Sequence, residues 1–223
     1  MIEIKNVSKS YIKGKKSIDD LNLEIKNGEI FGFLGPNGAG KTTTIRNIDE
    51  GDILVDGKSI KEEPIEAKKR FGFVPDNPDM FLKLKGIEYL MFMADVYDVP
   101  QDNRKERIEK LTKKFGIYGD LNSQIQSYSH GMRQKIVICG ALLSKPQNWI
   151  LDEPMTGLDP KSSFDLKQMM REHADSGKTV FFSTHILEVA EKICDRVGII
   201  NKGKLVFVGT FEEMKQKFKE NAS

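Results

Sequence analysis

Short apolar runs alternate with amphipathic segments over most of the chain. Residues 2–7 and 18–25 alternate apolar and polar side chains, which predicts two strands with one buried face. Continuous apolar runs predict buried strands at 29–34, 71–74, 149–151 and 179–183. Helical spacing begins at Pro64 and at Pro160, and Pro is favoured in the first turn of a helix. Strands that alternate with helices predict an α/β fold with a parallel sheet covered on both faces.

The pattern changes after the chain breaker Pro75-Asp76-Asn77-Pro78. Apolar residues then keep spacings of three and four through 87–94 and 108–115, which is typical of helices, and Pro146 ends this stretch. We therefore predict one domain built from an α/β core over 1–75 and 147–223 and an inserted helical subdomain over 76–146.

Three local signals predict how neighbouring elements join. Asn27-Gly28 predicts a tight hairpin turn into the strand at 29–34. Asn201-Lys202-Gly203-Lys204 predicts a hairpin between the apolar runs on either side of it. Thr210 and Glu213 have the spacing of a capping box at the start of the last helix.

The helix expected from Thr42 is unusually short. Asp49-Glu50-Gly51 follows within two turns, whereas the average helix has about three turns. Residues missing between Ile48 and Gly51 would produce the same pattern, and the sequence leaves that possibility open.

Charge and cysteine content narrow the possible classes of function. Charged residues make up 30% of the 223 positions, yet the formal net charge is only +2, which gives no strong field for nucleic acid. Cys139 and Cys194 lie far apart in apolar helical patterns, as expected of core residues in a reducing compartment. The longest apolar run, 136–143, is too short for a membrane helix, and Met1-Ile2-Glu3-Ile4 begins a strand rather than a signal peptide. We expect a cytosolic chain.

A glycine-rich stretch follows the apolar run at 29–34 and precedes a helix start. Its residues are Gly35, Pro36, Asn37, Gly38, Ala39, Gly40, Lys41, Thr42 and Thr43. Glycines allow successive N–H groups to converge on one anion, and the following helix start favours negative charge. Lys41 is expected to contact the β- and γ-phosphates of a nucleotide, and the Thr42 hydroxyl is a candidate ligand of Mg²⁺.

Polar residues also stand where two other predicted strands end. Asp152 and Glu153 follow the strand at 149–151, and ligands of parallel sheets gather beyond the carboxyl ends of strands. Asp152 is a candidate Mg²⁺ ligand together with Thr42, and Glu153 can accept a proton from an attacking water or orient it. His185 follows the strand at 179–183, where it either contacts the γ-phosphate or has a structural role.

These residues, in this order, resemble the nucleotide-binding subunit of an ABC (ATP-binding cassette) transporter over nearly the whole chain. The matching motifs are Tyr11 (A-loop), Gly35 to Thr42 (Walker A), Tyr128-Ser129-His130-Gly131-Met132 (signature), Ile150-Leu151-Asp152-Glu153 (Walker B), Gly157-Leu158-Asp159 (D-loop) and Ser183-Thr184-His185 (H-loop). The resemblance implies a P-loop NTPase (RecA-like) fold, in which an antiparallel β subdomain and the inserted helical subdomain accompany the parallel-sheet core.

The resemblance also implies a head-to-tail dimer, homodimeric or pseudo-symmetric, with two ATP molecules and Mg²⁺ between the subunits. Ser129 and Gly131 would then touch the γ-phosphate held by the other copy's Lys41, while Tyr11 stacks on the base and His185 contacts the γ-phosphate. Two departures from the family pattern matter. His130 and Met132 make the signature similar to that of export-type members. Either Asp76, as a further metal ligand, or Asn77 takes the place of the usual Q-loop glutamine.

The sequence thus predicts an ATPase that powers export through a separate transmembrane permease, at the inner face of the cell membrane. A non-transport ABC-type ATPase that acts on ribosomes or DNA is the alternative, although tandem cassettes and a long coiled-coil insertion, which would favour it, are absent from this sequence. A regulatory module that only binds ATP is a third possibility, against which Glu153 and His185 argue.

Overall fold

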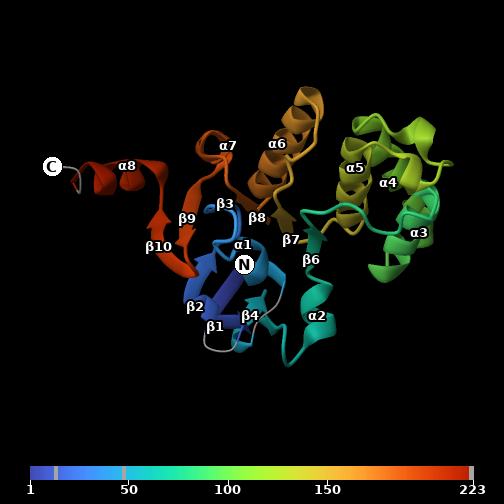
Figure 1. Ribbon diagram of the computed structural model, residues 1–223. Coiled ribbons are helices and arrows are strands. Elements are labelled where there is room, and N and C mark those ends of the chain that lie inside the picture. The colour runs from blue at the N-terminus through green and yellow to red at the C-terminus, as the bar shows by residue number, and fades with distance from the viewer. Residues whose placement is uncertain (13–14, 47–48, 221–223) are drawn as a thin grey trace.

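The computed structural model describes residues 1–12, 15–46 and 49–220, which form two stacked sheets and several helices (Figure 1). The antiparallel sheet contains β1 (Ile2–Ile12), β2 (Lys15–Ile25), β4 (Glu50–Val55) and β5 (Lys58–Ser59), in the order β2-β1-β4-β5. The larger sheet has the order β10-β9-β3-β8-β7-β6. Its strands are β3 (Ile30–Leu34), β6 (Phe71–Val74), β7 (Asn148–Asp152), β8 (Thr179–Thr184), β9 (Arg196–Asn201) and β10 (Lys204–Gly209).

The larger sheet is parallel except for β10, which forms the expected hairpin with β9. Every residue of β3, β7 and β8 is buried, which explains the continuous apolar runs in the sequence. Along β3, Ile30 and Leu34 belong to the core shared with the helices, whereas Phe31 and Phe33 belong to the core shared with the antiparallel sheet. The period of two in a strand thus divides β3 between two apolar cores.

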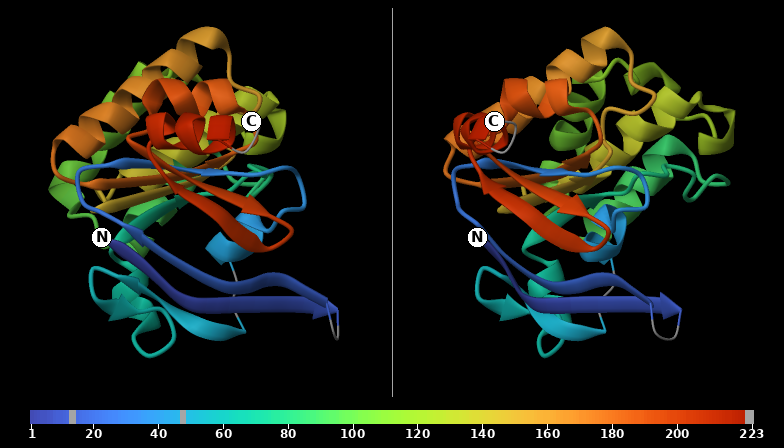
Figure 2. Two further views of the ribbon diagram at one scale, coloured as in Figure 1. Left: turned by 90° about the vertical axis from the view of Figure 1, so that its left-hand side faces the viewer. Right: turned by 60° about the vertical axis from the view of Figure 1, so that its left-hand side comes forward.

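Helices cover one face of the larger sheet and the antiparallel sheet covers the other (Figure 2). The covering helices are α6 (Pro160–Asp175), α7 (Leu187–Ile193) and α8 (Phe211–Glu220). The sequence pattern did not predict α7. The capping box of α8 is confirmed, because the Glu213 N–H donates to the Thr210 hydroxyl and the Thr210 N–H donates to the Glu213 carboxylate.

The predicted hairpin at Asn27-Gly28 is wrong, because β2 and β3 belong to different sheets. Both edges of β3 already pair with parallel neighbours, β8 and β9, so no edge remains for β2. The turn instead carries the chain from one sheet to the other. Gly28 has a φ of +80°, and its N–H donates to the Lys178 carbonyl at 3.0 Å, next to β8.

The segment after β6 is helical, as expected, and lies to one side of the larger sheet (Figure 1). It contains α3 (Gly86–Val96), α4 (Gln101–Lys114) and α5 (His130–Leu142), with 3₁₀ turns η1 (Tyr118–Asp120) and η2 (Ile125–Ser127). Two short helices, α1 (Lys41–Arg46) and α2 (Pro64–Lys68), lie before it in the chain. The question of missing residues beside Ile48 falls outside the described residues. None of the helices in the described ranges combines the length and apolar composition needed to cross a bilayer.

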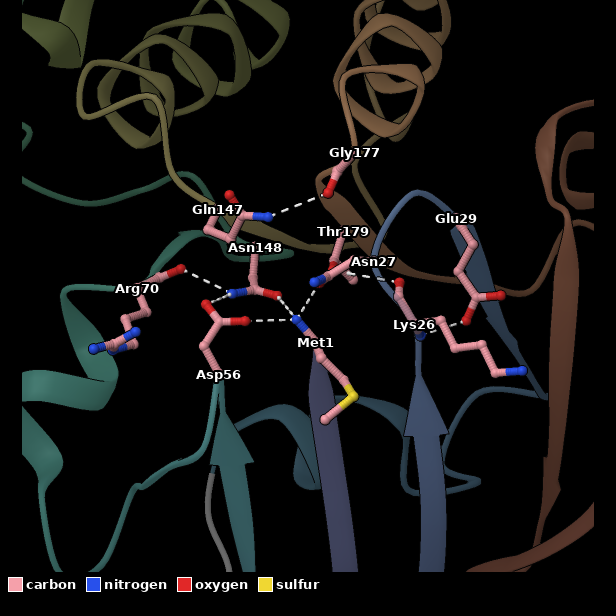
Figure 3. A network of polar contacts seen from close by, with 10 residues as sticks. All are labelled: Met1, Lys26, Asn27, Glu29, Asp56, Arg70, Gln147, Asn148, Gly177 and Thr179. Atoms are coloured by element: carbon pink, nitrogen blue, oxygen red, sulfur yellow. Dashed lines mark hydrogen bonds and ion pairs between the residues drawn. The ribbon is translucent and has the colours of Figure 1, made fainter.

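A polar network ties the two sheets together at the start of β7 (Figure 3). The α-amino group of Met1 donates to Asn27, to Asp56 at 2.6 Å and to Asn148 at 3.1 Å. The Asn148 amide also donates to the Asp56 carboxylate at 2.8 Å and to the Arg70 carbonyl at 3.1 Å. The first strand of one sheet is therefore anchored to an inner strand of the other.

Candidate functional site

A cavity of about 430 Å³ opens where the glycine-rich stretch passes the end of β7. It is lined by Ser17, Asn37, Gly38, Gly40, Lys41, Thr42, Asp76 and Glu153. Five of these belong to the 35–43 stretch predicted to bind phosphates, and Asp76 and Glu153 come from the ends of β6 and β7. Parallel strands end at one edge of the sheet, so residues far apart in the sequence meet here.

The loop between β3 and α1 packs closely on neighbouring backbone. At Gly40, φ is +109°, and a Cβ atom would lie 2.9 Å from the carbonyl of Ser17. At Gly35, a Cβ atom would lie 2.5 Å from the carbonyl of Ile200. Glycine is required at both positions, because any other side chain would push the loop off its support. The loop is thus fixed by contacts with β2 and β9.

Lys41 brings a buried positive charge into the cavity, with 6% of its side chain exposed. Its Nζ donates to the carbonyl of Gly35 at 2.5 Å and to that of Pro36 at 3.3 Å, and it lies 3.5 Å from Oε1 of Glu153. A buried ammonium group is stable only where such partners compensate its charge. Phosphate oxygens are the strongest alternative partners that a nucleotide brings.

Asp152 is completely buried at the end of β7. Its Oδ1 accepts a hydrogen bond of 2.5 Å from the hydroxyl of Ser183, on the neighbouring strand β8. The same Ser183 hydroxyl accepts from the N–H of Glu153 at 3.1 Å. Ser183 therefore contacts both acidic residues, the Asp152 carboxylate and the Glu153 backbone. The sequence did not suggest this role, because a serine at the end of a strand is not specific to any one function. The Asp152 carboxylate and the Thr42 hydroxyl are hard oxygen donors, the kind that Mg²⁺ prefers.

Glu153 is held in an uncommon backbone conformation, with a φ of +46°. Such a conformation costs on the order of 1 kcal/mol or more for a residue other than glycine and is concentrated at functional sites. Its carboxylate lies 3.1 Å from Nδ1 of His185 and 3.5 Å from Nζ of Lys41. The Glu153 carboxylate thus lies between Lys41 and His185, the two side chains predicted to contact phosphate. The His185 side chain is nearly half exposed.

The two candidates for the Q-loop position differ in where they lie. Asp76 lines the cavity, while Asn77 is exposed, and its Oδ1 accepts from the N–H of Asp79 at 2.9 Å. Asp76 is consequently the residue placed near the phosphate loop. Ser17, which also lines the cavity, was not predicted from the sequence, which carries no signal for it.

Ser129 and Gly131 are not among the described residues that line this cavity. Ser129 caps α5, with its hydroxyl accepting from the N–H of Met132 at 3.3 Å, and Gly131 lies against the backbone of Gly157. Tyr11 belongs to β1 and Thr43 to α1, but their side chains fall outside the described part of the structure. Within one copy, the signature residues and the phosphate loop are therefore separate.

Comparison with known proteins identifies the family. The family model described as ABC transporter matches residues 18–156. The chain is 38% identical over 213 residues to an uncharacterized ABC transporter ATP-binding protein, YhcH, of Bacillus subtilis, covering 92% of this chain and 68% of the relative. It is 36% identical over 217 residues to the linearmycin resistance ATP-binding protein LnrL of the same organism, covering 94% of this chain and 69% of the relative.

A solved structure of the ATP-binding subunit of an ABC transporter matches with a TM-score of 0.92 and 30% identity. The match covers 98% of this chain and 93% of that one. Sequence and fold therefore agree, and the predicted P-loop NTPase fold is confirmed. The chain belongs to the ABC transporter family, as an ATPase subunit that binds ATP with Mg²⁺.

Proposed function

We propose that this subunit powers export of a substrate through a separate transmembrane permease, by closing on a second subunit around ATP. The observation that carries the proposal is the meeting of Lys41 and Glu153, 3.5 Å apart, in the cavity beside the phosphate loop. A phosphate-binding cation and a candidate base for water in one cavity are the pair that phosphoryl transfer to water needs.

Within one copy, we assign the residues as follows. The loop from Gly35 to Gly40 and Thr43 surrounds the phosphates, Lys41 contacts the β- and γ-phosphates, and Tyr11 stacks on the base. The Thr42 hydroxyl and the Asp152 carboxylate would hold Mg²⁺, which supplies positive charge beside the phosphates. Asp76, which lines the cavity, would be a further ligand of Mg²⁺, directly or through water.

Glu153 orients the attacking water and accepts its proton, and His185 contacts the γ-phosphate. The distance of 3.1 Å between the Glu153 carboxylate and Nδ1 of His185 supports this pairing, because each side chain restrains the other. The link from Glu153 to Lys41 must open when phosphate oxygens arrive. Binding of ATP thereby releases the carboxylate toward the water it orients.

The second half of each site comes from another copy or a related subunit, in head-to-tail arrangement. Ser129 and Gly131 do not line the cavity of their own chain, so in this arrangement they reach the γ-phosphate bound by the partner. An N-capping hydroxyl at the start of a 13-residue helix suits this contact, since both the hydroxyl and the helix N-terminus favour an anion. This contact exists only in the closed state, and therefore drives closure.

Exposed apolar side chains mark the surface that we assign to the permease. Phe81 is 44% exposed and Phe92 is 43% exposed, with ring centroids 5.4 Å apart, and Met80 and Val96 are also exposed nearby in the chain. This surface starts four residues after Asp76, so a change at the cavity is transmitted directly to it. The inserted subdomain 76–146 is then the moving part, and the subunit lies at the cytoplasmic face of the membrane.

The export direction rests on the signature residues His130 and Met132. LnrL, the relative named for linearmycin resistance, is consistent with it. The alternative, an ABC-type ATPase acting on ribosomes or DNA, would be favoured by a strong positive field, which a formal net charge of +2 does not indicate. Co-purification with a membrane protein supports the transport role, whereas co-sedimentation with ribosomes would replace it.

The decisive experiment replaces Glu153 with Gln, which removes the charge and keeps the shape. The Glu153→Gln variant should bind ATP, lose at least about 100-fold in kcat and form a stable dimer with ATP, seen by size-exclusion chromatography with light scattering. Adding Ser129→Asp should abolish that dimer, because Asp keeps the N-cap of α5 but repels phosphate. Unchanged turnover in Glu153→Gln, or a dimer that persists in the double variant, would contradict the proposal.

A further inference from the structure

The first turns of α5 are in contact with the loop that follows Glu153. We call this contact the clasp: His130, Gly131, Gln134 and Lys135 of α5 against residues 154–159. Nζ of Lys135 lies 2.8 Å from Oδ2 of Asp159, at the end of the loop. At its start, the side-chain amide of Gln134, 1% exposed, donates to the carbonyl of Pro154 at 3.5 Å.

Between these two ends, the backbones approach as closely as glycine allows. A Cβ atom on Gly131 would lie 2.7 Å from the carbonyl oxygen of Gly157. A Cβ atom on Gly157, where φ is +76°, would lie 2.2 Å from Cδ2 of the His130 ring. The signature residues and the loop thus leave no room for independent movement, and they shift together or lose contact.

The Lys135–Asp159 pair is the polar anchor of the clasp. Lys135 is only 14% exposed, so the pair is partly shielded from solvent. Asp159 also caps α6: its Oδ1 accepts from the Ser162 N–H at 2.9 Å and its Oδ2 from the Ser162 hydroxyl at 2.7 Å. The hydrogen bond from Lys135, followed by those from Ser162, holds the pKa of Asp159 well below its usual range. One carboxylate therefore connects α5, the loop and α6.

The clasp joins two groups that serve different ATP molecules in the dimer proposed above. Glu153, one residue before the loop, acts on the ATP of its own copy, whereas Ser129, one residue before α5, contacts the ATP of the partner. We propose that Lys135 is a positioning residue, which couples the signature end of α5 to the placement of Glu153 through Asp159. This inference rests on the proposed function, because it gives the two ATP sites a physical link inside each chain.

The test compares Lys135→Gln, which removes the charge, with Lys135→Arg, which keeps it. Lys135→Gln should lower kcat for ATP about tenfold, while the dissociation constant for a fluorescent ATP analogue stays within twofold of wild type. Lys135→Arg should restore at least half of the wild-type kcat. The matched control is Lys113→Gln, which breaks an exposed pair of similar length, 2.6 Å to Glu109 in α4, and should leave kcat unchanged.

Each other outcome overturns the inference. A kcat within twofold of wild type in Lys135→Gln would show that the pair has no positioning role. Equal losses in folded Lys135→Arg and Lys135→Gln, or a parallel loss of nucleotide binding, would show that Lys135 acts through general packing. The proposed function has a separate test in the Glu153→Gln variant. If that variant hydrolysed ATP at the wild-type rate, the proposed function would be contradicted, whatever the result for Lys135.

Discussion

Each end of β7 carries a network of polar contacts, but the two networks have different roles. At its start, Asn148 is fully buried and bonded to Met1, Asp56 and the Arg70 carbonyl (Figure 3). At its end, Asp152 and Glu153 are bonded to β8, and the Glu153 carboxylate also faces a cavity of about 430 Å³.

The difference shows what separates a structural network from a functional one. Around Asn148, the partners come from the chain itself, so the network is complete and stabilises the packing of the sheets. Around Glu153, the carboxylate lies 3.5 Å from Nζ of Lys41, longer than a close ion pair, and the backbone of Glu153 is in the left-handed region. Changes at one end should therefore reduce activity, and changes at the other should reduce stability.

The largest effect is expected at the cavity end, from Lys41→Met. Removal of this buried charge leaves the developing negative charge on phosphate without its main side-chain partner, so kcat should fall at least about 100-fold. The melting temperature should change little, because Met keeps the stem of the side chain. ATP hydrolysis and thermal unfolding are measured on the same preparation. Lys58→Met, which breaks an exposed ion pair with Glu63, is the control and should change neither kcat nor the melting temperature.

At the start of β7, Asn148→Ala should have the opposite profile. It leaves the partly buried Asp56 carboxylate without the Asn148 amide donor, whereas the Arg70 carbonyl keeps the backbone N–H of residue 148 at 3.1 Å. The free energy of unfolding should therefore fall by about 1 to 3 kcal/mol. The kcat of the folded variant should stay within twofold of wild type. Chemical denaturation checks the first expectation, with Asn103→Ala on the exposed face of α4 as control. A large loss of kcat in folded Asn148→Ala would contradict the proposal that the start of β7 serves stability and its end serves activity.

A smaller effect, on the pH dependence of stability, is expected from His173, which packs near the start of β7. Burial, and secondarily the charge of Lys178, lowers the pKa of His173 to about 4. The His173 ring packs edge-on against the Trp149 ring, with 5.7 Å between the ring centroids. The folded pKa lies below the unfolded value of 6.5, so the unfolded chain binds the proton first as pH falls. Stability present above pH 6.5 should thus be lost toward pH 4, by about 1 to 2 kcal/mol at pH 5 after allowance for partial exposure.

Denaturation followed by the fluorescence of Trp149, the single tryptophan, measures this loss. His173→Phe removes the titrating group and should flatten the profile between pH 8 and pH 5. An equally steep profile in that variant would mean that other groups cause the loss.

The sequence by itself determined most of the strands and helices, α7 excepted, and the chemistry near each of them. Fully buried strands produce continuous apolar runs, and a phosphate loop needs glycines at fixed spacing, so both are visible in a linear pattern. The capping box at Thr210 and the hairpin between β9 and β10 were predicted correctly for the same reason, since their determinants lie within a few residues.

Tertiary structure alone decided which sheet each strand joins and which polar groups meet. Asn27-Gly28 has the local signature of a hairpin, but β3 has no edge left to pair with β2, because β8 and β9 occupy both. Ser183 orients Asp152 and Glu153, and Lys135 meets Asp159, through contacts between residues 24 to 31 positions apart. Local propensity carries no information about such pairs, since they depend on how strands and helices pack in three dimensions.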